Sequence, residues 1–139
     1  MAHKIFRKGT WSKGHKVAIF SDENPARAAA ESKKATDLLT KQIRRTNGIE
    51  GVESVNGVWG GKSERSYIAY GMSEKMVRYL GRIYGQEAVI HGRNGKWVLI
   101  DIATGTKTVL GKSVTGGTAA NQPGDGYTLL PTGEWFQIQ

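Results

Sequence analysis

The 139-residue chain contains no cysteine, and this absence excludes several kinds of site at once. Without thiols there is no disulfide, no thiolate-ligated zinc or iron–sulfur centre, and no cysteine nucleophile. No apolar run approaches the roughly 18–20 residues that a membrane-spanning helix needs. The first residues are basic and no apolar stretch follows them, so we expect no signal peptide and no membrane partner. A cytoplasmic protein is the simplest expectation, or a virion protein if the gene belongs to a phage.

Sequence motifs of common catalytic chemistries are also missing. There is no Gly-x-Ser-x-Gly elbow, and the three histidines (His3, His15 and His91) have no second ligand at a metal-binding spacing. Residues 111–113 end like a phosphate loop, but the first glycine that the loop needs is absent. We therefore predict that the protein is not an enzyme and uses no metal and no cofactor.

Basic residues are abundant and unevenly distributed. Lys and Arg number 20 against 12 Asp and Glu, which gives a formal net charge of +8. Residues 1–20 hold five of the bases and no acid, whereas residues 113–139 hold two acids and no base. An excess of positive charge attracts polyanions, although it is equally consistent with solubility alone.

Apolar periodicity and turn signals predict the element order β-α-β-β-α-β, followed by a further strand. The expected strands are 16–20, 52–59, 65–70, 87–91, 96–101 and 107–110, and the expected helices run from an Asn24-Pro25 start to Asn47-Gly48 and from Ser73 to Gly85. Asn94-Gly95 is the strongest local signal, since both positions suit a type I′ hairpin turn. Its two-residue loop places Arg93 opposite Lys96 and His91 opposite Val98.

This order predicts a ferredoxin-like α+β fold, with both helices on one face of a mainly antiparallel sheet and an extra C-terminal hairpin strand. The third and fourth strands should both run antiparallel to the first. The chain is expected to divide into a basic N-terminal arm (1–14), the α+β domain (15–110), a Gly/Thr-rich linker (111–126) and an apolar C-terminal docking segment (127–139).

The basic residues are candidates for contact with an acidic partner, most simply nucleic acid. They lie in the arm and on the polar face of the first helix, and comprise Lys4, Arg7, Lys8, Lys13, Lys33, Lys34, Lys41, Arg44 and Arg45. A solvated helix face is the commoner meaning of such a cluster. Tyr67 and Tyr70 do not form a base-stacking pair, because strand alternation points them to opposite faces.

Large aromatic residues near both ends suggest a second function. Phe6 and Trp11 lie in the arm, and Trp135 and Phe136 lie in the C-terminal segment. The alternative hypothesis is a structural or host-interaction component of a phage particle that docks on other chains through these rings. A homo-oligomer or a larger assembly follows from that interpretation.

Three polar residues that are distant in sequence are predicted to meet at one rim of the sheet. Asn24 precedes the first helix, Glu64 precedes the third strand, and Gln86 follows the second helix. Capping and hairpin pinning explain such a cluster more simply than a small polar binding site does. These residues, with the run Tyr-Gly-Gln-Glu-Ala-Val at 84–89, resemble a bacterial and phage-borne family numbered 3293 among domains of unknown function. The resemblance covers about residues 16–100 and implies the fold and the Asn24–Glu64–Gln86 cluster, but no reaction.

Overall fold

The computed structural model describes residues 16–21, 29–45, 49, 51–93, 96–112, 114–117, 120 and 122–138. These residues form two helices and one nine-stranded sheet. The helices are α1 (Ala29–Arg45) and α2 (Glu74–Ile83), and the strands are β1 (Lys16–Ser21), β2 (Gly51–Trp59), β3 (Lys62–Tyr70), β4 (Ala88–Arg93), β5 (Lys96–Asp101), β6 (Lys107–Gly111), β7 (Val114–Gly117), β8 (Tyr127–Leu129) and β9 (Trp135–Ile138).

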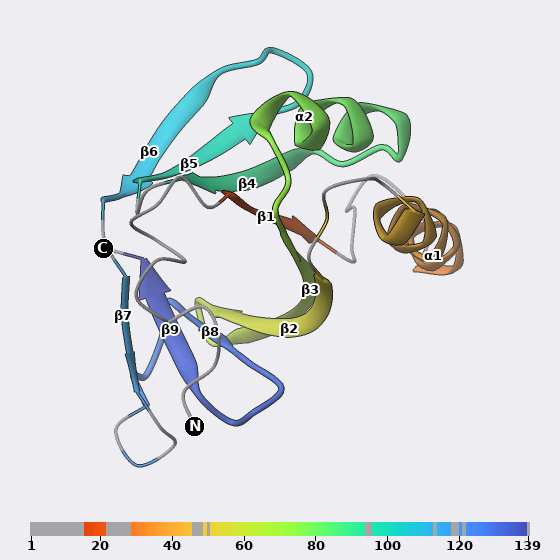
Figure 1. The fold of residues 1–139 in the computed structure, drawn as a ribbon. Coiled ribbons are helices and arrows are strands. Elements are labelled where there is room, and N and C mark those ends of the chain that lie inside the picture. Colours follow the sequence, from red (N-terminus) through yellow and green to blue (C-terminus); the bar gives the residue numbers. More distant parts are fainter. Residues whose placement is uncertain are drawn as a thin grey trace.

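The strands pair in the order β6-β5-β4-β1-β3-β2-β8-β9-β7, and neighbouring strands are antiparallel throughout. The sheet curls into a half-barrel, with α1 and α2 on its convex side (Figure 1). Strand β6 is followed in the chain by β7, and these two strands are the opposite ends of the order. The chain therefore crosses from one sheet edge to the other between Gly111 and Val114.

The predicted ferredoxin-like α+β fold is wrong, because the molecule is mostly sheet and the sheet is a curled half-barrel. The expected antiparallel pairing of β3 and β4 with β1 is present. However, β8 pairs with the free side of β2, and β9 and β7 continue the sheet from there. The predicted linker therefore contains β7, and the predicted docking segment contains β8 and β9. All three are strands of the same sheet as β1.

The β4–β5 hairpin has the predicted register. Arg93 pairs with Lys96 and His91 pairs with Val98, as the two-residue loop requires. The turn residues 94 and 95 lie outside the described residues. This register positions the side chains that matter below, since paired residues on neighbouring strands share one face of the sheet.

Helix α2 also follows its sequence signals. The Ser73 hydroxyl caps its start by accepting from the Met76 backbone N–H at 3.2 Å, and Gly85 follows its end with φ +69°. Val77 and Leu80 are buried, whereas Ile83 is half exposed at 51%. In α1, Leu39 and Ile43 are buried and Leu38 is exposed, and the predicted start at residue 24 lies outside the described residues.

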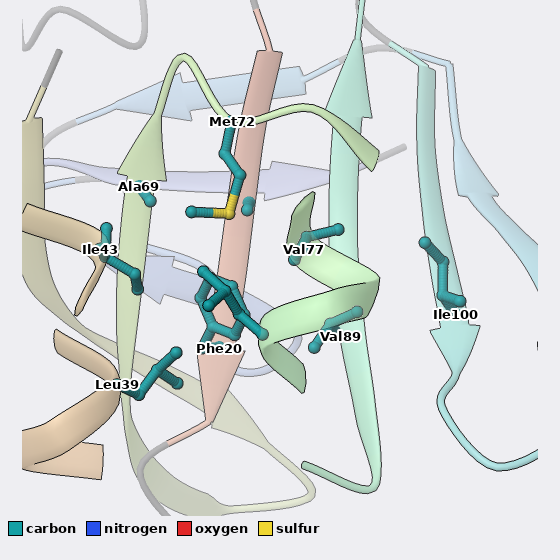
Figure 2. Close-up of a cluster of buried hydrophobic side chains, with 10 residues drawn as sticks. Phe20, Leu39, Ile43, Ala69, Met72, Val77, Val89 and Ile100 are labelled. Carbon is teal, nitrogen blue, oxygen red and sulfur yellow. The ribbon is translucent and has the colours of Figure 1, made fainter. Parts of the chain in front are cut away.

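One apolar core fills the space between the sheet and the helices. Figure 2 shows that Leu39 and Ile43 of α1 and Val77 of α2 lie around Phe20 of β1, with Met72 above them. The cluster comprises Ala18, Phe20, Leu39, Ile43, Ala69, Met72, Val77, Leu80, Val89 and Ile100. Alternate residues of β1 supply Ala18 and Phe20 to this side, which leaves Val17 and Ile19 for the other.

A second apolar core lies on the concave side. Trp97 of β5 and Phe136 of β9 stack with ring centroids 6.0 Å apart, although many strands separate β5 from β9 in the sheet order. Only a strongly curled sheet brings these two rings together. Val17, Ile19, Val55, Ile68, Tyr70 and Leu130 complete the cluster. Burying these side chains stabilises the curl through the hydrophobic effect.

Candidate anion-binding site

Three cations form a row across the sheet at the end where β1 begins. Lys16 of β1 pairs with Arg93 of β4, and Arg93 pairs with Lys96 of β5. We call Lys16, Arg93 and Lys96 the cationic row. It lies on the same face as Ala18 and Val89, and therefore on the helix side of the sheet. None of its members forms an ion pair with another described residue.

The cationic row lines a cavity of about 540 Å³. The other lining residues are Ser73, Glu74, His91, Val98 and Lys107. Among the described residues, four lysine and arginine side chains thus surround this space against a single carboxylate. Positive charge that converges on a concave, partly desolvated space strengthens attraction for an anion.

Glu74 partly neutralises the cavity from the start of α2. Its carboxylate accepts a hydrogen bond from Lys107, with Nζ 2.8 Å from Oε2, and Arg78 Nη1 lies 3.9 Å from the same oxygen. The hydrogen bond from Lys107 lowers the pKa of Glu74, which is therefore ionised at neutral pH. Lys107 is accordingly paired with Glu74, and the cationic row supplies the uncompensated charge.

His91 forms part of the cavity wall and is only 4% exposed. Its Nε2 donates to the Met72 carbonyl oxygen at 2.9 Å, because a carbonyl can only accept. Burial lowers the pKa of His91, and the charges of Lys16 and Arg93 lower it further, while the Met72 carbonyl and Glu74 act in the opposite direction. The ring is thus neutral at pH 7, with Nδ1 as its acceptor.

The last turn of α1, which carries Arg44 and Arg45, lies toward the same end of the sheet. Helix α1 ends at Arg45, shortly before β2 begins at Gly51, and Gly51 pairs with Tyr70, which pairs with Val17. Lys34, Lys41, Arg44 and Arg45 are exposed. The side chain of Lys33 lies outside the described residues, as do Lys4, Arg7, Lys8 and Lys13.

The predicted polar rim lies at the opposite end of the sheet. Glu64 precedes Ser66, the partner of the last residue of β1, and Gln86 precedes β4. Gln86 is 9% exposed, and its backbone N–H donates to the Gly81 carbonyl at 2.8 Å. Asn24 lies outside the described residues.

The C-terminal aromatics predicted to dock on a partner are buried within the chain itself. Phe136 is 0% exposed and stacks on Trp97, and Trp135 is 7% exposed with its ring edge-on to Tyr127. These two rings hold β9 in the sheet. Phe6 and Trp11, their counterparts in the arm, lie outside the described residues.

Sequence reasoning missed the cationic row, His91 and Lys107 as site residues. A signal was present in the hairpin register, which already placed Arg93 beside Lys96. The pairing of β1 with β4 adds Lys16 to these two, and this pairing is not encoded locally. Counting charges along the chain therefore pointed to the arm and α1, because residues 16, 93, 96 and 107 are scattered in sequence.

Comparisons with known proteins add no relative to this picture. No family model matches the chain, and no curated protein matches it. The resemblance to the family numbered 3293 remains an expectation from short motifs. Within the described residues, no helix is long and apolar enough to cross a membrane, and no three His, Asp or Glu side chains gather as metal ligands.

Proposed function

We propose that this protein is a non-catalytic binding protein for an acidic partner, most simply nucleic acid, and that the cationic row and its cavity are the contact site. The observation that carries the proposal is the convergence of Lys16, Arg93 and Lys96 from three neighbouring strands. Like charges brought this close oppose folding unless other interactions outweigh them, and a bound anion relieves their repulsion.

Two exposed bases of α1 lie toward the same end of the sheet as the cationic row. Arg44 and Arg45 occupy the last turn of a helix that ends toward the same end of the sheet. A polyanion carries many phosphates and so matches two separate basic groups, whereas a single small anion matches only the cavity. Nucleic acid therefore fits the distribution of charge better than a free anion does.

The alternative of a phage component that docks through its arm and tail has less support. Trp135 and Phe136 are enclosed by the chain's own strands, so the tail does not offer these rings to another protein. Docking through the arm stays a prediction, because residues 1–14 lie outside the described part of the chain.

Salt-dependent binding tests the proposal with a matched pair of variants. We compare R93Q/K96Q with K62Q/R65Q, which removes the same charge from exposed positions near the start of β3. Affinity for a fluorescent oligonucleotide is measured by anisotropy over a range of KCl concentrations. The log–log slope should fall by roughly 0.7–0.9 for each phosphate that R93Q/K96Q no longer neutralises, and much less in the control.

Two outcomes contradict the proposal. The wild-type chain fails to bind any oligonucleotide at low salt, or the two double variants weaken binding equally. The second result assigns the affinity to net charge rather than to the cationic row. Thermal unfolding of both variants checks that they are folded under the binding conditions.

A further inference from the structure

A second group of cations lies on the outer face of α2, together with an exposed ring. Lys75, Arg78, Tyr79 and Arg82 are spaced i, i+3, i+4 and i+7 and so form one stripe along the helix. We call this group the α2 stripe. Val77, Leu80 and Gly81 are buried, which directs the stripe away from the core. The Tyr79 ring is 56% exposed, although an apolar ring is better stabilised by burial.

The α2 stripe forms one wall of a cavity of about 510 Å³. The turn between β5 and β6 forms the opposite wall, through Ile102, Ala103, Thr104 and Gly105. Arg78 holds the walls together, since its Nη2 donates to the Gly105 carbonyl oxygen at 2.9 Å. The Tyr79 ring therefore borders a space that is fixed by the fold and accessible from solvent.

This second cavity adjoins the first. Glu74 lines both cavities and contacts a base on each side, Lys107 toward the cationic row and Arg78 toward the α2 stripe. The two cavities thus form a continuous surface over the start of α2. Along it, the cationic row and the bases Lys75 and Arg82 of the α2 stripe provide phosphate contacts, and Tyr79 provides the aromatic face beside Arg82. Arg78 is held by Gly105 and Glu74 and stabilises the cavity.

We propose that the nucleic acid bound here is single-stranded and that one of its bases stacks on Tyr79. This inference rests on the proposed function and specifies its ligand class. In a duplex the flat faces of the bases are covered by their neighbours, so a ring in a protein cavity stacks only on a base that is free. Sequence-tolerant binding of single strands combines a positively charged groove with such an aromatic platform.

The test separates stacking from charge by the choice of probe. The full chain and its Y79A and Y79F variants are titrated with a thymidine oligonucleotide, with an abasic oligonucleotide of the same length, and with a duplex. The wild-type chain should prefer the thymidine strand over the abasic one by roughly 5- to 150-fold. Y79A should lose most of this preference and keep its affinity for the abasic strand, whereas Y79F, which keeps the ring, should behave as wild type.

The possible failures are distinguishable. The wild-type chain could bind the thymidine and abasic strands equally, or the thymidine strand and the duplex equally, with salt-dependent affinity. Either result overturns the stacking inference and leaves the proposed function in place. An equal loss of preference in Y79F and Y79A assigns the effect to the hydroxyl and overturns it as well. Absence of binding to all three probes overturns the proposed function itself. Because Tyr79 is exposed, its variants should unfold at the wild-type temperature.

Discussion

Two rows of side chains lie one residue apart on β1, β4 and β5, and they have opposite characters. The cationic row faces the helix side, while Val17, Gly92 and Trp97 pair in the neighbouring row, which faces the concave side. We call this second set the apolar row. Val17 and Trp97 are 1% and 0% exposed, whereas Arg93 and Lys96 are exposed.

The comparison shows how strand alternation separates stability from binding. Each strand contributes one residue to the concave core and its neighbour to the charged surface, so the core fixes the spacing of the cations. If this division is correct, changes in the apolar row alter the free energy of unfolding and leave the affinity of the folded protein intact. Changes in the cationic row should lower the affinity without lowering the free energy of unfolding.

The largest expected effect comes from truncating Trp97. Its indole ring is fully buried and stacks on Phe136, so the W97A substitution removes the ring that joins β5 to β9. We expect the free energy of unfolding to fall by about 3–5 kcal/mol, measured by urea denaturation. A decrease below about 1 kcal/mol would mean that the two sides of the half-barrel are held together by other interactions.

An intermediate effect is expected from adding one methyl group to the apolar row. A Cβ at position 92 would lie 2.9 Å from three atoms of the Trp97 ring, and the rigid indole cannot move without disturbing Phe136. We expect G92A to lower the free energy of unfolding by about 1–3 kcal/mol through overpacking. The matched control is G124A, because a Cβ there meets nothing within 4 Å.

A double-mutant cycle makes the Gly92 prediction specific. If the clash with the indole is the cause, G92A should cost less in a W97L background than in the wild-type chain. Equal costs in both backgrounds would place the strain in the backbone instead. Oligonucleotide affinity of the folded G92A protein should stay close to that of wild type, since the added methyl group faces the concave side and Arg93 faces the other side of the sheet.

The parts of the fold that were predictable are those with a local signal. Asn94-Gly95 determined the β4–β5 register, and Ser73 with Gly85 marked the ends of α2. The C-terminal strands gave no such signal, because β7, β8 and β9 are three to four residues long and two residues of β7 are glycine. Their pairing depends on β2 and on burial against Trp97, which are non-local interactions.

The candidate site, like the overall fold, depends on non-local pairing. Arg44 and Arg45 were predicted as contact residues because a helix face is a local pattern, whereas the cationic row requires the register between β1 and β4. That register is determined by which side chains fill the concave core, since a shift by one residue would expose Val17 and bury Lys16. The apolar row therefore had to be known before the cationic row could be recognised.

The smallest effect tests whether His91 belongs with the core or with the charged surface. Burial lowers its pKa below the ordinary value of 6.5, so as pH falls through that value the unfolded chain takes up a proton before the folded chain does. Stability should therefore decline from about pH 6.5 downward, with a slope of at most about 1.4 kcal/mol per pH unit. The H91Q variant keeps an N–H donor for the Met72 carbonyl and should lack this component of the decline.

The same variant reports on the charged surface. An anion beside Lys16, Arg93 and Lys96 favours the protonated His91 ring, so oligonucleotide affinity should rise between pH 7.5 and about 6 more in wild type than in H91Q. The free energy of unfolding and the oligonucleotide affinity of wild type and H91Q are therefore measured at both pH values. A stability decline that H91Q lacks, without a gain in affinity, would assign His91 to the core alone.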